Sequence, residues 1–193
     1  MQKKFVNKNN LNQFIENDFN KILQVVSQCR TQKNELIKFY NTLIKLNKKN
    51  RVHIFGNGGS ASIASHFSMD LTNNSKIKCL SYNDASIITC FANDFKFENW
   101  IKRSVEKFGE KEDVLILISS SGKSQNMINA IKAARQKKFY KVITLTGFEK
   151  NNPLKKLGHI NLHIDSKNYN HIESTHQIML LSIVDMVKKF SKK

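Results

Sequence analysis

The chain has 193 residues, enough for one domain that buries a sizeable core. Its 40% hydrophobic content and single proline exclude a disordered chain, and no apolar run approaches the roughly eighteen residues of a membrane span. The three cysteines are odd in number and lack metal-site spacing, which predicts free thiols in a reducing compartment. The first ten residues lack the apolar core of a secretory signal, so we expect a cytoplasmic protein with no membrane partner.

The net charge of +17 at pH 7 is the one unusual feature of the composition. Such a charge suits nucleic-acid binding or the electrostatic steering of a small anionic substrate. The basic clusters, for example residues 135–141, carry no aromatic platform on which bases could stack. We interpret the charge as a lysine-rich bias spread over solvated faces and expect no nucleic-acid partner.

In chain order, residues 11–47 carry apolar positions at helical spacing, and a polar break near residues 30–34 divides them into two helices. Helical patterns then alternate with short apolar runs, and a long helix is predicted over residues 169–190. The predicted strands are residues 52–55, 77–80, 114–118, 142–145 and 160–164. This alternation is typical of an α/β fold with a parallel sheet flanked by helices. We predict a single domain, 1–193, in which residues 1–50 form the N-terminal helices and 51–193 the α/β core.

A glycine-rich turn, Gly56-Asn57-Gly58-Gly59-Ser60, joins the first predicted strand to a helical pattern. Glycines here allow positive φ and a close approach of the backbone to a ligand. The helix that follows directs its N–H groups and positive dipole end at the loop, which favours a phosphate or sugar oxygen. The loop matches neither common nucleotide fingerprint, so we expect no nucleotide cofactor. A ligand-free turn would explain this loop equally well.

A second loop of the same kind follows the strand predicted at 114–118. It reads Ser119-Ser120-Ser121-Gly122-Lys123-Ser124, and a helical pattern begins after it. Hydroxyls and backbone N–H groups at a helix start can bind a phosphate, whereas one serine would suffice as a helix cap. Both loops follow the carboxyl ends of strands, where α/β proteins bind ligands, so we expect one shared site.

These segments together resemble the sugar isomerase (SIS) domain and, within it, the phosphoheptose isomerase family. The resemblance runs in order from about residue 11 to 190. Beyond the two loops it includes the segments 92–95, 142–147 and 172–176. It implies a cytoplasmic homotetramer with a five-stranded parallel sheet, whose N-terminal helices pack between subunits. The implied activity is conversion of sedoheptulose 7-phosphate to a D-glycero-D-manno-heptose 7-phosphate for lipopolysaccharide or capsule heptose synthesis.

Carried over by position, the resemblance assigns sugar contacts to the first loop and to the segment 92–95, and phosphate contacts to the serines. The implied substrate-binding residues are Asn57, Gly58, Gly59, Ser60, Asn93, Asp94, Ser119, Ser120, Ser121 and Ser124.

The chemistry also requires a base that moves one carbon-bound proton, and an acid or a metal that polarises the carbonyl oxygen. The family uses a His and a Glu on one helix, and a Gln and a His on the last helix, and commonly binds zinc there. Here His66 is retained, but Asp70 replaces the Glu, Glu173 replaces the Gln and Leu181 replaces the C-terminal His. We predict Asp70 and Glu173 as candidate bases, with His66 as an acid or a metal ligand.

Spacing suggests how these side chains could meet. His66 and Asp70 are four residues apart, and Glu173 and His176 are three apart, so each pair is expected on one helix face. Such a set could hold Zn²⁺ or another divalent metal, with His176 as the weakest candidate. His171 is a further candidate for replacing the missing acid.

Two functions remain open. The retained loops and carboxylates favour a phosphosugar aldose–ketose isomerase. The loss of the expected His at Leu181 favours a non-catalytic SIS module that binds a phosphosugar or, as in one related branch, the replication initiator protein. The sequence does not distinguish the exact sugar phosphate, the metal or the pathway.

Overall fold

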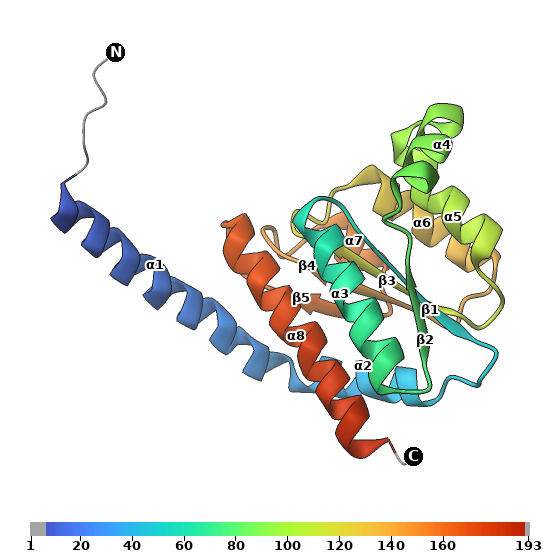
Figure 1. The fold of residues 1–193 in the computed structure, drawn as a ribbon, viewed down its shortest axis with the longest axis horizontal. Coiled ribbons are helices and arrows are strands. Elements are labelled where there is room, and N and C mark those ends of the chain that lie inside the picture. The colour runs from blue at the N-terminus through green and yellow to red at the C-terminus, as the bar shows by residue number, and fades with distance from the viewer. Residues whose placement is uncertain (1–6, 192–193) are drawn as a thin grey trace.

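The computed structural model describes residues 7–191. Residues 1–6 lie outside the described part. The prediction that the first ten residues hold no secretory signal falls mostly on them. A five-stranded parallel sheet with the order β2-β1-β3-β4-β5 forms the centre of the fold (Figure 1). The strands are β1 (Arg51–Gly56), β2 (Lys78–Ser81), β3 (Val114–Ser119), β4 (Lys141–Thr146) and β5 (Ile160–His163). The α/β prediction and all five predicted strands are therefore confirmed.

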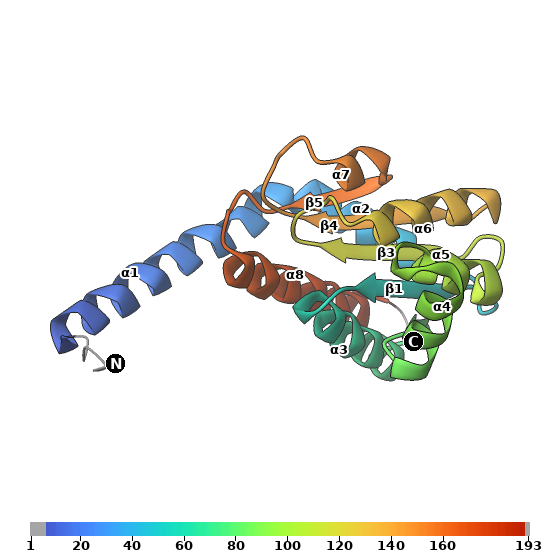
Figure 2. The same cartoon turned by 90° about the horizontal axis from the view of Figure 1, so that it is seen from above.

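Helices connect the strands and cover both faces of the sheet (Figure 2). Their bounds are α1 (Lys8–Ser27), α2 (Lys33–Ile44), α3 (Gly59–Asn74), α4 (Ala85–Phe95), α5 (Trp100–Phe108), α6 (Gln125–Gln136), α7 (Pro153–Leu157) and α8 (Tyr169–Phe190). Short 3₁₀ turns at Gln28–Gln32 and Phe97–Asn99 complete the order. The predicted polar break between the first two helices is this first 3₁₀ turn.

The central strand β3 shows why the sheet is buried on both sides. All its residues are buried, and they alternate between two apolar clusters. Val114, Ile116 and Ile118 join the cluster that α2, α3 and α8 cover. Leu115 and Leu117 join the opposite cluster, under α5 and α6. A continuous apolar run is what a parallel strand covered on both faces requires.

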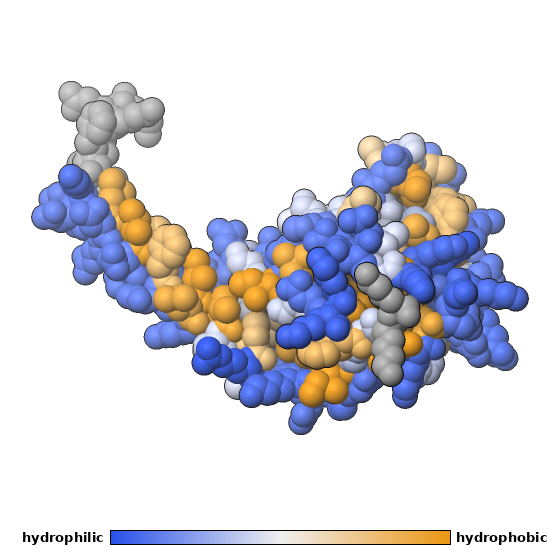
Figure 3. Space-filling view, turned by 60° about the horizontal axis from the view of Figure 1, so that its bottom comes forward, coloured by the Kyte–Doolittle hydropathy of each residue, from blue (hydrophilic) through white to orange (hydrophobic). Residues whose placement is uncertain are grey.

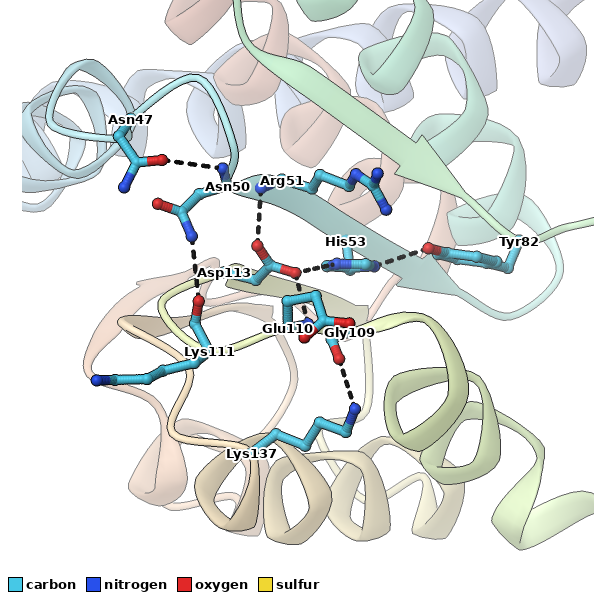
Figure 4. A network of polar contacts seen from close by, with 10 residues as sticks. All are labelled: Asn47, Asn50, Arg51, His53, Tyr82, Gly109, Glu110, Lys111, Asp113 and Lys137. Carbon is cyan, nitrogen blue, oxygen red and sulfur yellow. Dashed lines mark hydrogen bonds and ion pairs between the residues drawn. The ribbon is translucent and has the colours of Figure 1, made fainter.

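A buried polar network ties β1 to β3 near their amino ends (Figure 4). His53 Nδ1 lies 2.8 Å from the hydroxyl of Tyr82, and His53 Nε2 lies 2.8 Å from Asp113 Oδ2. The Asp113 carboxylate also accepts hydrogen bonds from the backbone N–H groups of Arg51 and Glu110. Burial alone would raise the pKa of Asp113, but these hydrogen bonds outweigh it and lower the pKa. Hydrogen bonds thus hold His53, Tyr82 and Asp113 together at a buried position on this side of the sheet.

Helix α1 extends away from the body of the molecule (Figures 1 and 3). Near its C-terminal end Val25 is buried in the core, and Asp18 Oδ1 lies 2.9 Å from Nε2 of His171 on α8. Among the described helices, none combines the length and the apolar character needed to cross a membrane.

Candidate functional site

The two ligand loops lie side by side because β1 and β3 are neighbouring parallel strands, with Gly56 opposite Ile118 at their carboxyl ends. A reciprocal amide pair then joins them. Asn57 Nδ2 donates to Asn126 Oδ1 at 3.2 Å, and Asn126 Nδ2 donates to Asn57 Oδ1 at 3.0 Å. The expectation that both loops share one edge of the sheet is confirmed, and Asn126, which the sequence did not single out, is the residue that joins them.

The first loop is shaped by its glycines. Gly58 has φ +56°, a left-handed conformation that other residues adopt at a cost, and it caps α3 with no side-chain hydrogen bond. A β-carbon on Gly56 would overlap the backbone of Ser60, so the chain can turn this tightly only with glycine. Ser60 itself is buried beneath the turn. The backbone N–H groups of Ser60 and Ala61 donate to the carbonyls of Asn57 and Gly58, so the turn itself caps the start of α3.

The second loop presents serine hydroxyls at the start of α6. Ser119 Oγ and Ser124 Oγ lie 3.1 Å apart, and Ser121 Oγ accepts from the backbone N–H of Lys123 at 3.2 Å. The buried Ser120 Oγ has no hydrogen-bond partner within the described part of the chain. Ser124, the residue before α6, makes no side-chain cap bond. Buried hydroxyls normally have partners, so the loop has donor capacity that the chain itself does not use.

Glu173 on α8 reaches the first loop. Its carboxylate occupies the space in which a β-carbon of Gly59 would lie, so glycine at position 59 makes room for it. Burial raises the pKa of Glu173 above its ordinary value.

His66 on α3 lies between two partners. Its Nε2 is 3.3 Å from Asp70 Oδ2, which confirms that the pair shares a helix face. On the other side, Gln177 Nε2 of α8 lies 2.7 Å from His66 Nδ1. The side chains of His66 and Asp70 are 52% and 39% exposed, so a small molecule can reach them. Gln177 was not predicted. Its one sequence signal is that it lies four residues after Glu173, a spacing that places both residues on one face of the helix.

His176 points elsewhere. It is fully buried, and its Nε2 donates to the backbone carbonyl of Thr146 at the end of β4. Burial lowers its pKa to about 4, so the ring is neutral at pH 7. The expectation that Glu173 and His176 act on one face is wrong: Glu173 faces the first loop, whereas His176 faces the sheet.

The predicted metal ligands therefore do not converge within one chain. Between residues 7 and 191, no three His, Cys, Asp or Glu side chains come close enough together to hold a metal ion. Both ring nitrogens of His66 already have partners. The donor set does not fit a zinc ion in this arrangement, and zinc binding stays a prediction.

Three other predicted residues make none of these contacts with His66 or the first loop. Asn93 and Asp94 are exposed on α4, and Asn93 Nδ2 donates to Asp94 Oδ1 at 3.0 Å. His171, the candidate for the missing acid, is buried and paired with Asp18. Leu181 follows Gln177 by one turn on α8 and is half-buried.

A cavity of about 730 Å³ opens at the opposite end of the sheet, lined in part by Leu43, Lys48, Lys76, Val187 and Lys188. The helices α2, α3 and α8 all end there. Lysines are favoured beside helix C-termini, so the charge of this cavity has a structural explanation. None of the predicted site residues lines it.

Comparison with known proteins shows the family to which the chain belongs. The family model described as "SIS domain" matches residues 18–147. A phosphoheptose isomerase from Helicobacter pylori (strain P12) is 36% identical over 150 residues, covering 75% of this chain and 77% of the relative. One from Histophilus somni (strain 2336) is 37% identical over 142 residues, covering 71% and 67%. The chain belongs to the phosphoheptose isomerases of the SIS domain family.

Solved structures of this family share the fold. Phosphoheptose isomerase GmhA from Neisseria gonorrhoeae superimposes with a TM-score of 0.85 at 24% identity, covering 92% of this chain and 99% of that one. The phosphoheptose isomerase from Francisella tularensis gives 0.84 at 23% identity, covering 92% and 97%.

Proposed function

We propose that the chain is an aldose–ketose isomerase that converts sedoheptulose 7-phosphate to D-glycero-D-manno-heptose 7-phosphate. The observation that carries this proposal is the arrangement of two Gly/Ser loops at adjacent strand ends, with the Glu173 carboxylate beside Gly59 of the first loop. Its relatives with 36–37% identity are named phosphoheptose isomerases.

The serine loop would hold the phosphate. Ser119, Ser120, Ser121 and Ser124 offer hydroxyl donors at the start of α6, where backbone N–H groups and the helix dipole also favour an anion. The unpartnered hydroxyl of Ser120 gains a hydrogen bond when the phosphate binds. Asn57, Gly58, Gly59 and Ser60 would then lie along the sugar, with Asn93 and Asp94 as further contacts.

The reaction moves a carbonyl from C2 to C1. A carboxylate takes a proton from C1, the C2 oxygen is protonated, and an enediol forms. Loss of the proton from the C1 oxygen and return of a proton to C2 then complete the aldehyde. Glu173, whose pKa is raised by burial beside the sugar loop, and Asp70, which is paired with His66, are the two candidate bases.

The direct test is to follow isomerisation and proton exchange of sedoheptulose 7-phosphate by NMR in D₂O, with and without Zn²⁺. We expect turnover by the unmodified chain and a large loss in Asp70→Asn or Glu173→Gln. The matched control is Asp185→Asn, an exposed carboxylate further along α8. Turnover that survives both site substitutions would contradict the assignment of the bases.

We also propose that the chain acts as a cytoplasmic homotetramer in heptose synthesis for lipopolysaccharide or capsule. An exposed apolar row along α1 supports the assembly, since Leu11, Phe14, Ile15, Phe19 and Leu23 are 50–66% exposed (Figure 3). Contiguous apolar surface of this kind marks a protein interface, and a second copy of α1 offers the same surface.

A second candidate is a non-catalytic module that binds a phosphosugar. Leu181 favours it, because a leucine neither transfers protons nor binds metals. Saturable binding of sedoheptulose 7-phosphate without any proton exchange would support this function instead.

A further inference from the structure

The side chains between α3 and α8 form a continuous chain of contacts: Gln177, His66 and Asp70. Gln177 Nε2 lies 2.7 Å from His66 Nδ1, and His66 Nε2 lies 3.3 Å from Asp70 Oδ2. An amide N–H can only donate, so it requires an unprotonated Nδ1. In the tautomer with an unprotonated Nδ1, the ring hydrogen is on Nε2, the nitrogen that lies 3.3 Å from Asp70 Oδ2.

We propose that Gln177 is a positioning residue, which fixes the His66 tautomer so that His66 orients Asp70 for proton transfer without a metal ion. This inference rests on the proposed isomerase function. Gln177 would thereby compensate for Leu181, one turn further along α8, where the sequence lacks the expected histidine. In this arrangement Gln177 holds the His66 ring, and the ring in turn orients the Asp70 carboxylate.

The same contacts explain why the metal donors do not assemble. To bind a metal ion, His66 would need a ring nitrogen with a free lone pair. The lone pair of Nδ1 accepts the hydrogen bond from Gln177. His176 uses its Nε2 hydrogen to bind the Thr146 carbonyl inside the core, and the Glu173 carboxylate lies against Gly59. These hydrogen bonds thus engage two of the four predicted metal ligands, His66 and His176, within the chain.

The experiment compares three single variants. Gln177→Leu removes the amide at a half-buried helix position that tolerates leucine. Gln177→Glu keeps the size of the side chain but replaces the donor by a carboxylate, so that His66 lies between two carboxylates and the doubly protonated ring is favoured. Gln136→Leu, at an exposed position near the end of α6, is the matched control.

The first readout is kinetic. We expect the chelator-treated chain to remain active, and kcat to fall about 10- to 100-fold in Gln177→Leu with little change in KM. Gln177→Glu should lose at least as much, whereas a purely structural polar contact would tolerate it. The second readout is the ring nitrogen signals of His66 in ¹H–¹⁵N spectra, identified by their absence in His66→Asn. The Nε2–H tautomer is expected in the unmodified chain, and a ring with a hydrogen on both nitrogens is expected in Gln177→Glu.

Two results would overturn the inference: activity that is lost on chelation and restored by Zn²⁺, or His66 signals and kcat that are unchanged in both Gln177 variants. If the unmodified chain turns over no sugar phosphate with or without Zn²⁺, the proposed function fails separately. The His66 nitrogen signals then decide on the relay alone, because they require no substrate.

Discussion

The carboxylate of Glu173 occupies the space that a side chain at position 59 would need. Glycine at position 59 therefore makes room for the Glu173 side chain of α8, and it also lies in a tight turn. We predict that Gly59→Ala leaves the fold intact, because the end of the flexible Glu173 side chain can move aside. The displaced carboxylate should lower kcat/KM for sedoheptulose 7-phosphate on the order of 100-fold. Steady-state kinetics and thermal unfolding measure the two effects, and Ser62→Ala on the exposed side of α3 is the control. Unchanged kinetics would show that the position of Glu173 is not important.

Ser120→Ala should change stability and binding in opposite directions. Its hydroxyl is buried and has no partner within residues 7–191, so removing it should leave the unfolding free energy unchanged or slightly higher. Loss of a hydrogen bond to a charged phosphate should weaken binding about 10- to 100-fold. Calorimetry with sedoheptulose 7-phosphate and urea unfolding test both parts. A destabilised protein with unchanged affinity would mean that Ser120 has a structural role only.

Breaking the His53 network should lower the free energy of unfolding without lowering the turnover of the folded protein. Replacing His53 by alanine leaves the buried Asp113 carboxylate and the Tyr82 hydroxyl without their shared partner. We expect about 3 kcal/mol of destabilisation and normal turnover by the folded protein. Because the pKa of Asp113 is lowered in the folded state, its contribution is present above the unfolded-state pKa and is lost as the pH falls through the folded value. Urea unfolding between pH 7 and pH 3 should therefore show a smaller acid dependence in Asp113→Asn.

His176 predicts a different pH window. Its pKa falls from 6.5 in the unfolded chain to about 4 in the folded one, so the unfolded state binds more protons between these values. Stability should then decrease as the pH falls from about 6.5 to 4, by roughly 3 kcal/mol from this residue. His176→Gln keeps a donor for the Thr146 carbonyl but does not titrate. If the variant loses as much stability as the unmodified chain over this range, the assignment to His176 is wrong.

The apolar row on α1 predicts that assembly depends on this helix. Phe14→Glu together with Phe19→Glu places two charges on surface that we expect a second copy to cover. Light scattering should show a smaller species than the unmodified chain. Gln13→Glu with Gln24→Glu adds the same charge on the other side of α1 and should not alter the mass. An unmodified chain that is already monomeric would contradict the proposed tetramer.

Much of the fold could be predicted because each element carries its own signal. The apolar run of β3 and the serines after it predicted both a strand and the loop at its end. The last helix begins at Tyr169 and ends at Phe190, as its spacing predicted. The neighbouring strands β1 and β3 then follow from the general geometry of parallel sheets.

The contacts between α3 and α8 were less predictable. Helix spacing predicts which residues share a face of a helix, but not which neighbouring element that face packs against. Glu173 and His176, three residues apart, diverge because α8 packs against both α3 and the sheet. Gln177 is as polar as many surface residues, and only the rotation of α8 against α3 brings it to His66. Asn126 likewise resembles an ordinary helix residue until β1 and β3 are placed side by side.

The Asn57–Asn126 pair has a consequence for how the substrate is captured. Each carboxamide uses a donor and an acceptor on the other, so a ligand hydroxyl that competes for Asn57 would also perturb α6, the helix that follows the serine loop. The two halves of the ligand then bind interdependently. Inorganic phosphate should alter the affinity for phosphate-free sedoheptulose, and the sugar should alter the affinity for phosphate by the same factor.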